Sequence, residues 1–175
     1  MFYDLETAKA VADKIADKLA QADAAHANDY KANASNFGDQ ADTLATAERA
    51  IGQAHPGVSV VATEPVAHYL LVNSGIADRT PPTFASAMEE GDDPSPADVA
   101  AVLDLINSRQ VSALVLNKQT ETPVTNQLRD AAGKSSVPII EVTETLPEGL
   151  NYLDWQRQTV DEFGKDLAQA ALPAR

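Results

Sequence analysis

Apolar side chains recur every three or four positions through the first third of the chain, the spacing of amphipathic helices. Asp4 stands where a helix N-cap is expected, and a second, alanine-rich stretch of the same period covers residues 27–54 after a break around Asp23. The small side chains suit close packing of the two helices. One apolar stripe of the first helix is predicted to be buried: Leu5, Ala8, Val11, Ala12, Ile15 and Leu19.

The period of the pattern changes after residues 55–57, His-Pro-Gly. A short β-branched run at 58–63 predicts a strand, and Glu64-Pro65 then begins an apolar helical segment that ends at Gly75. The proline-rich passage over residues 78–96 carries a short helix around Phe84, Ala87 and Met88. We interpret this passage as a long connection or a partial lid.

Strand and helix alternate through the rest of the chain. The predicted elements are a helix capped by Ser95, a strand at 111–116, a helix from Thr122-Pro123 to Gly133, a strand at 137–142 and a helix at 153–172. Such alternation predicts an α/β fold, with a small parallel sheet flanked by helices and right-handed crossovers. Residues 1–57 form the long N-terminal helical segment and residues 58–175 the α/β lobe, together one compact unit.

The composition limits which partners and which metal ligands are available to this chain. Among 175 residues, 13 Lys and Arg face 26 Asp and Glu, so the formal charge is -13 and a phosphate backbone would be repelled. Nucleic acid is therefore a poor candidate partner. The chain has no cysteine, so any metal site must use oxygen and imidazole ligands.

Parallel sheets bind ligands at the carboxyl ends of their strands, which directs attention to the loops after Thr63, Leu116 and Val142. Glu64 and Glu144 follow two of these strands, so their carboxylates are expected at the same edge of the sheet. From its position alone, Glu64 is read as a helix cap in preference to a metal ligand, and Glu144 as a solvated loop acid. As a pair, they would serve as acid and base or as half of a metal site.

Other candidate residues carry less weight. His68 lies one helical turn after Glu64 on the same face, where it is a possible metal ligand, although a packed or surface role is favoured. The loop 117–121, Asn-Lys-Gln-Thr-Glu, is interpreted as a polar turn in preference to a group that orients ligands. No phosphate loop, Gly-x-Ser-x-Gly elbow or His-Glu-x-x-His motif supports catalysis, and we expect no enzyme activity.

Five segments together resemble the C-terminal half of metal-binding ABC transporter solute-binding proteins, and they match in order over nearly the whole chain. The resemblance implies two α/β lobes joined by a rigid long helix, which the opening helix resembles, with the metal held between the lobes. The segments are Phe2-Tyr3-Asp4, residues 62–70 (ATEPVAHYL), 94–98 (PSPAD), 117–121 (NKQTE) and 142–149 (VTETLPEG).

By this resemblance, Glu64 and Glu144 supply two ligands to zinc or manganese, and two histidines come from an N-terminal lobe that we expect to be missing here. The chain alone is then expected to hold no metal tightly. The resemblance further implies an extracytoplasmic location, as a periplasmic protein or cell-surface lipoprotein, delivery of the ion to an ABC permease, and a link to cell adhesion. Two alternatives stay open: an α/β protein-interaction module without metal, and, less favoured, a hydrolase that uses the carboxylate pair.

Overall fold

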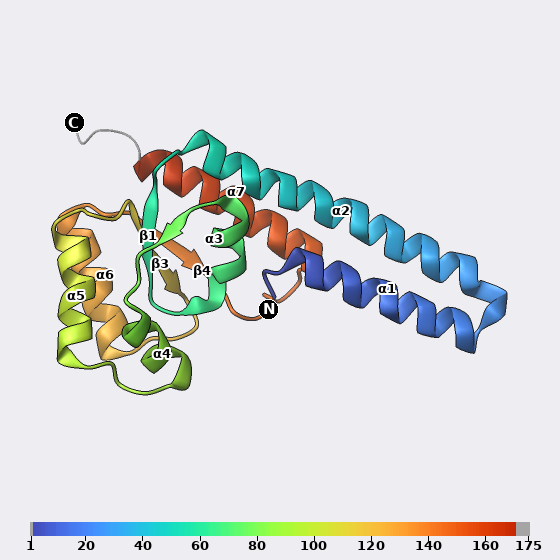
Figure 1. Ribbon diagram of the computed structural model, residues 1–175, viewed down its shortest axis with the longest axis horizontal. Coiled ribbons are helices and arrows are strands. Elements are labelled where there is room, and N and C mark those ends of the chain that lie inside the picture. The colour runs from blue at the N-terminus through green and yellow to red at the C-terminus, as the bar shows by residue number, and fades with distance from the viewer. Residues whose placement is uncertain (1, 171–175) are drawn as a thin grey trace.

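A long helical hairpin projects from an α/β body in the computed structural model, which describes residues 2–170 (Figure 1). The hairpin consists of α1 (Leu5–Ala22), a short 3₁₀ turn and α2 (Ala27–Ala54). Asp4 caps α1 as predicted, since its Oδ1 accepts a hydrogen bond from the Thr7 backbone at 3.1 Å. The predicted bounds of the second helix are confirmed.

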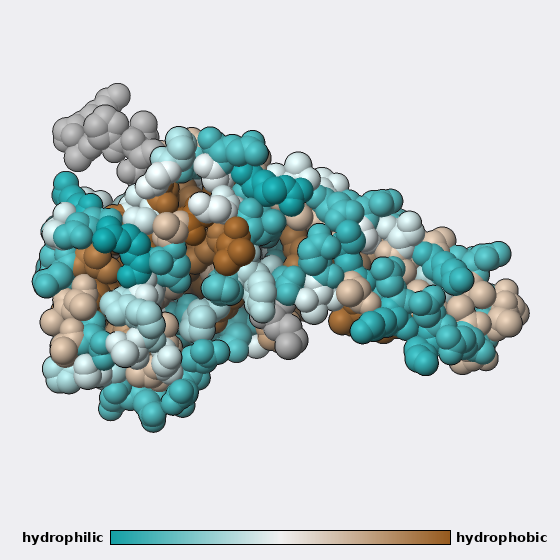
Figure 2. All heavy atoms as spheres, viewed as in Figure 1, coloured by the Kyte–Doolittle hydropathy of each residue, from teal (hydrophilic) through white to brown (hydrophobic). Residues whose placement is uncertain are grey.

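The predicted burial of the apolar stripe of α1 is confirmed at Leu5 and wrong further along the helix. Val11, Ile15 and Leu19 are 49%, 54% and 43% exposed, whereas the buried side chains of α1 are Leu5 and Ala16. Helix α1 packs against α2, and small side chains such as Ala16, Ala34 and Ala41 are buried along the hairpin. Figure 2 shows a brown, hydrophobic group on the lower edge of the hairpin, among mostly hydrophilic atoms.

The body contains a parallel sheet of four strands in the order β2-β1-β3-β4. Three strands were predicted and are confirmed; the fourth, β2, has only two residues and lacks an apolar run that a sequence pattern would reveal. The strands are β1 (Ser59–Ala62), β2 (Ala77–Asp78), β3 (Ala113–Asn117) and β4 (Ile139–Val142).

Helices cover both faces of the sheet (Figure 1). On one face, α2, α3 (His68–Ser74) and α7 (Tyr152–Ala170) pack over alternate strand residues such as Val60 and Val115, with Phe163 of α7 fully buried. On the other face, Val61 and Leu114 pack against α4 (Pro82–Glu90), α5 (Pro96–Asn107) and α6 (Pro123–Ser135). Strands buried on both faces are typical of parallel sheets.

Two predicted helix starts are confirmed by their caps. The Ser95 hydroxyl accepts from the Asp98 backbone, and Thr122 and Thr125 form a reciprocal capping box at the start of α6. The predicted end of this helix at Gly133 is wrong, because α6 continues to Ser135 and Ser136 adopts the left-handed conformation, φ 53°. The predicted end of the last helix lies outside the described residues.

Candidate functional site

The loops after β1, β3 and β4 meet at one edge of the sheet, beside a hollow of about 500 Å³. Both glutamates singled out from the sequence line this hollow. The expectation that they lie at the same edge is therefore met. The lining residues are Phe2, Tyr3, Glu64, Pro65, Val66, Met88, Glu89, Glu90, Gly91, Thr120 and Glu144.

Glu64 stands at the N-cap position of a 3₁₀ turn (Pro65–Ala67), in extended conformation with φ -151° and ψ 157°. Its side chain, however, makes no capping hydrogen bond. Instead, Glu64 Oε2 accepts a hydrogen bond at 2.7 Å from Nδ2 of Asn117, the last residue of β3. The cap interpretation is thus wrong for the side chain, because a partner from a neighbouring strand competes successfully with the local backbone.

Glu144 lies two residues beyond β4 and is exposed. Its backbone N–H donates to Gln119 Oε1 at 2.8 Å. The preceding residue, Thr143, is held on two sides: its carbonyl accepts from the Tyr3 hydroxyl at 2.8 Å and its Oγ1 from Trp155 Nε1 at 3.0 Å. Burial raises the pKa of Tyr3, so this hydroxyl remains a donor at neutral pH. The loop that carries Glu144 is therefore fixed at its base.

The hollow is acidic. Four glutamates line it and none of its lining residues, all within residues 2–170, is Lys, Arg or His. Carboxylate oxygens are ligands that divalent cations accept, and uncompensated negative charge attracts cations. Among the described residues, however, no three His, Cys, Asp or Glu side chains gather closely enough to hold a metal ion by themselves.

Two of these acids, Glu89 and Glu90, were not identified from the sequence. They end α4, just before Gly91, which closes the helix in the left-handed conformation. Helix α4 belongs to the proline-rich passage interpreted as a long connection or a partial lid, and the residues at its end line the hollow. The only signal for them in the sequence is their place at the end of a short helix, because the sequence does not predict where the proline-rich passage runs relative to the sheet.

The structure does not bring His68 to the hollow. His68 begins α3, is exposed, and stacks edge-on against Tyr69 with ring centroids 5.3 Å apart. The other histidines lie elsewhere: His26 Nδ1 contacts Asp23 Oδ2 at 2.8 Å, and His55 ends α2. The site proposed below therefore uses the two glutamates and not His68.

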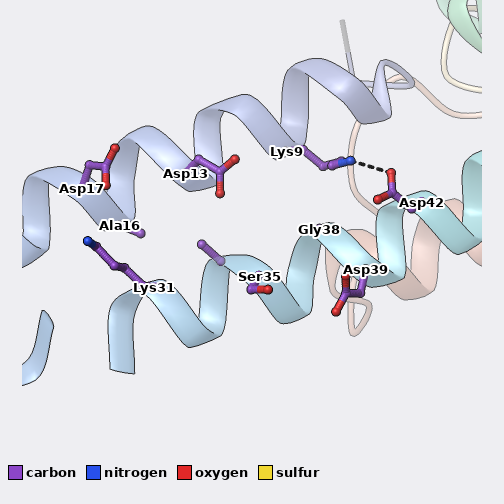
Figure 3. A pocket seen from close by; sticks show the side chains of 10 residues that line it. Lys9, Asp13, Ala16, Asp17, Lys31, Ser35, Gly38, Asp39 and Asp42 are labelled. Carbon is purple, nitrogen blue, oxygen red and sulfur yellow. Dashed lines mark hydrogen bonds and ion pairs between the residues drawn. The ribbon is translucent and has the colours of Figure 1, made fainter. Parts of the chain in front are cut away.

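A second hollow, of about 480 Å³, lies between α1 and α2 (Figure 3). Lys9 and Asp42 form an ion pair across it. Because its walls carry both lysines and aspartates, it lacks the single sign of charge found at the strand ends. The lining residues are Lys9, Asp13, Ala16, Asp17, Lys31, Ala34, Ser35, Gly38, Asp39 and Asp42.

The sequence profile of the family described as "Zinc-uptake complex component A periplasmic" matches residues 1–165. No curated protein sequence matches the chain. Within residues 2–170, no helix combines the length and the apolar character needed to span a membrane.

Solved structures share the fold at low sequence identity. Laminin-binding protein Lmb of Streptococcus agalactiae, described as an adhesin with metal transporting activity, superposes with a TM-score of 0.77 at 18% identity, over 95% of this chain and 63% of its own. Periplasmic zinc-binding protein TroA of Treponema pallidum gives 0.75 at 14% identity, over 95% and 62%. Pseudomonas aeruginosa FpvC, solved with Mn²⁺, gives 0.73 at 16%, over 97% and 62%. The chain thus spans under two thirds of these structures.

Proposed function

The chain belongs to the family of periplasmic zinc-uptake components A, and from this premise we propose that it forms one lobe of a receptor that captures zinc or manganese for an ABC importer. The receptor would work outside the cytoplasm, as a periplasmic protein or a surface lipoprotein, and would hand the ion to a membrane permease. It forms no covalent bond with its cargo. One observation carries the proposal: Glu64 and Glu144, from loops far apart in sequence, line the same acidic hollow.

Two carboxylates make half of a site. Zinc and manganese take four or more ligands, and carboxylates alone discriminate poorly between them. A second lobe that contributes imidazole ligands would complete the coordination and add selectivity. The 175-residue chain by itself should therefore bind metal weakly, with water filling the remaining positions.

The test is calorimetric titration of zinc and manganese into two proteins. One is this chain, and the other carries a second lobe ahead of residue 1. We expect tight binding only in the two-lobe form, and Glu64→Ala or Glu144→Ala should weaken that binding at least tenfold, since each removes a charged ligand.

Matched control variants separate ligand loss from loss of charge. Glu6→Gln and Glu121→Gln each remove an exposed carboxylate outside the hollow and should leave the affinity within about twofold, because exposed charges are screened. If the two-lobe form binds tightly and neither hollow variant matters, Glu64 and Glu144 are not ligands. If neither form binds metal, the receptor function itself is wrong.

The exposed apolar stripe of α1 supports the proposal of a second lobe. Val11, Ile15 and Leu19 lie four residues apart and so share one helix face, 43–54% exposed. Contiguous exposed apolar side chains often mark an interaction surface. A second lobe packed along this face would remove them from water, with each buried side chain contributing about 1.5–3 kcal/mol.

Ile15→Ser should therefore destabilise the two-lobe form by about 1 kcal/mol or more, yet change the stability of the 175-residue chain by only about 0.5 kcal/mol. Urea unfolding of both forms measures the difference. Lys14→Ser, at the neighbouring exposed position, is the control and should affect both forms equally. An equal effect of Ile15→Ser on the two forms would show that no lobe covers this face.

A protein-interaction module is the second candidate, and exposed apolar side chains near the same edge favour it. Phe2, which lines the hollow, is 54% exposed, and Leu146, two residues after Glu144, is 48% exposed. A protein partner could cover both. The metal titration decides between the candidates, because an interaction module would bind no metal in either form.

A further inference from the structure

The loop after β3 lies between the two candidate ligands. Strand β3 sits between β1 and β4 in the sheet, Glu64 follows β1, and Glu144 lies two residues beyond β4. The end of β3 and the loop that follows it therefore reach both acids, and each contact is made by a side-chain amide. Asn117 contacts Glu64, and Gln119 contacts the backbone of Glu144.

The orientation of the Asn117 amide is fixed by its partners. Asn117 is 1% exposed, and its Oδ1 accepts from the Gln119 backbone N–H at 3.0 Å. Because a backbone N–H is only a donor, the oxygen must face Gln119 and the NH₂ group must face Glu64. The two amide hydrogens go to Glu64 Oε2 at 2.7 Å and Thr120 Oγ1 at 3.0 Å. All of this buried amide is thus hydrogen-bonded, which holds the Glu64 carboxylate in one place.

Gln119 fixes the second loop in the same way. Its Oε1 accepts from the backbone N–H groups of Glu144 and Thr145, at 2.8 Å and 3.0 Å. Its Nε2 donates to Thr145 Oγ1 at 2.7 Å. Since two backbone N–H donors face the oxygen, the amide cannot be reversed without losing both of these hydrogen bonds. The side chain therefore sets the backbone position from which Glu144 projects.

Both contacts are made by neutral groups, and the cation of the same loop points elsewhere. Lys118 lies between the two amides but pairs with Glu141, Nζ to Oε2, at 3.2 Å, and does not line the hollow. Although burial alone would raise the pKa of Glu141, hydrogen bonds from Lys118 and Arg129 lower it, which keeps Glu141 charged as their partner. A lysine in place of either amide would neutralise a ligand; amides orient the acids without cancelling their charge.

From this geometry we infer that Asn117 and Gln119 are positioning residues of the metal site, a role that rests on the proposed function. Asn117 holds the carboxylate of Glu64, and Gln119 holds the loop of Glu144, so both ligands are placed before a cation arrives. Partners that orient metal ligands typically contribute about 10- to 100-fold to affinity.

The experiment is zinc titration of the two-lobe form with Asn117→Ala and Gln119→Ala. Each should weaken binding about tenfold, at the low end of that range. Gln119 is exposed, so its variant keeps the test valid if loss of the buried Asn117 prevents folding. Double-mutant cycles give the decisive readout. Asn117→Ala should not weaken zinc binding further when Glu64 is already Ala, and Gln119→Ala should weaken it only a little when Glu144 is already Ala.

A purely structural role would give a different pattern. Thr122→Ala, which removes the α6 cap in the same connection, should cost about 1 kcal/mol of stability and leave zinc affinity unchanged. If Asn117→Ala or Gln119→Ala leaves the zinc affinity unchanged, that residue does not position a ligand. The same holds if the variant weakens binding equally whether or not its partner, Glu64 or Glu144, has been replaced by Ala. If Glu64→Ala and Glu144→Ala themselves have no effect, the two acids are not ligands and the proposed metal site fails instead; if the two-lobe form binds no zinc, the proposed function fails.

Discussion

Replacing Gly52 with alanine is expected to destabilise the protein by about 3 kcal/mol or more, at the upper end of what overpacking costs. Gly52 lies on α2 where this helix meets the end of α3. A Cβ atom at this position would stand 1.6 Å from the Ser74 carbonyl oxygen and 2.8 Å from its carbon. Both are backbone atoms, so one helix must move away from the other and from the core that α3 shares with the sheet.

The same helix supplies the control. Gly38 also lies within α2, but a Cβ there would be 3.6 Å from Lys9 Cε, an ordinary contact. Gly38→Ala should therefore stabilise the protein by about 0.5–1 kcal/mol, the usual gain in a helix interior. Urea unfolding measures both variants. A Gly52→Ala protein as stable as the parent would show that α2 and α3 do not touch as described.

A change of about 3 kcal/mol with pH is expected from Glu48, which is buried on α2. Glu48 is 1% exposed; its Oε2 accepts from Asn73 Nδ2, and its Oε1 has no hydrogen bond among the described residues. Burial raises the pKa of Glu48 from 4.5 to about 7, against the opposing effects of the Asn73 bond and the nearby Arg49 charge.

The titratable groups that face Glu48 come from α7 and from the start of α1. From α7, Tyr152 faces it, and burial followed by the charge of Glu48 raises the pKa of Tyr152 to about 12. From the start of α1, Asp4 and Glu6 line the same small hollow. Because burial is outweighed by hydrogen bonds from Thr7, the pKa of Asp4 is lowered. Comparison of the parent with Glu48→Gln isolates the contribution of Glu48 between pH 4.5 and about 7.

The sign follows from proton binding. Between pH 4.5 and about 7, the folded state keeps the Glu48 proton that the unfolded state has released. Stability contributed by this group is thus full below pH 4.5, falls as the pH rises, and levels off above about 7. The free-energy difference between Glu48→Gln and the parent should shift by about 3 kcal/mol, in favour of the variant, from pH 4.5 to pH 8.

Urea unfolding across this pH range measures that difference. A flat difference for Glu48→Gln would show that water or a partner reaches the Glu48 carboxylate in solution.

Local signals in the sequence predicted most of the fold. Caps such as Ser95 and Thr122 act within one turn, and strands buried on both faces are continuous apolar runs, so both can be read without knowing the neighbours. The two-residue strand β2 was not predicted, because it carries no such apolar run. The position of Glu64 and Glu144 at one edge also followed from the sequence, since parallel strands end on the same side.

The partner of each side chain was decided by the tertiary structure. Glu64 occupies a cap position yet bonds Asn117, 53 positions away, and the loop of Glu144 is held by Gln119. The stripe through Ile15 has helical period, but only the packing of α1 on α2 determines that it stays exposed. The sequence by itself therefore determined the elements and the edge that bears the acids, because these depend on neighbours along the chain. Contacts between distant segments decided what orients the acids and which faces remain uncovered.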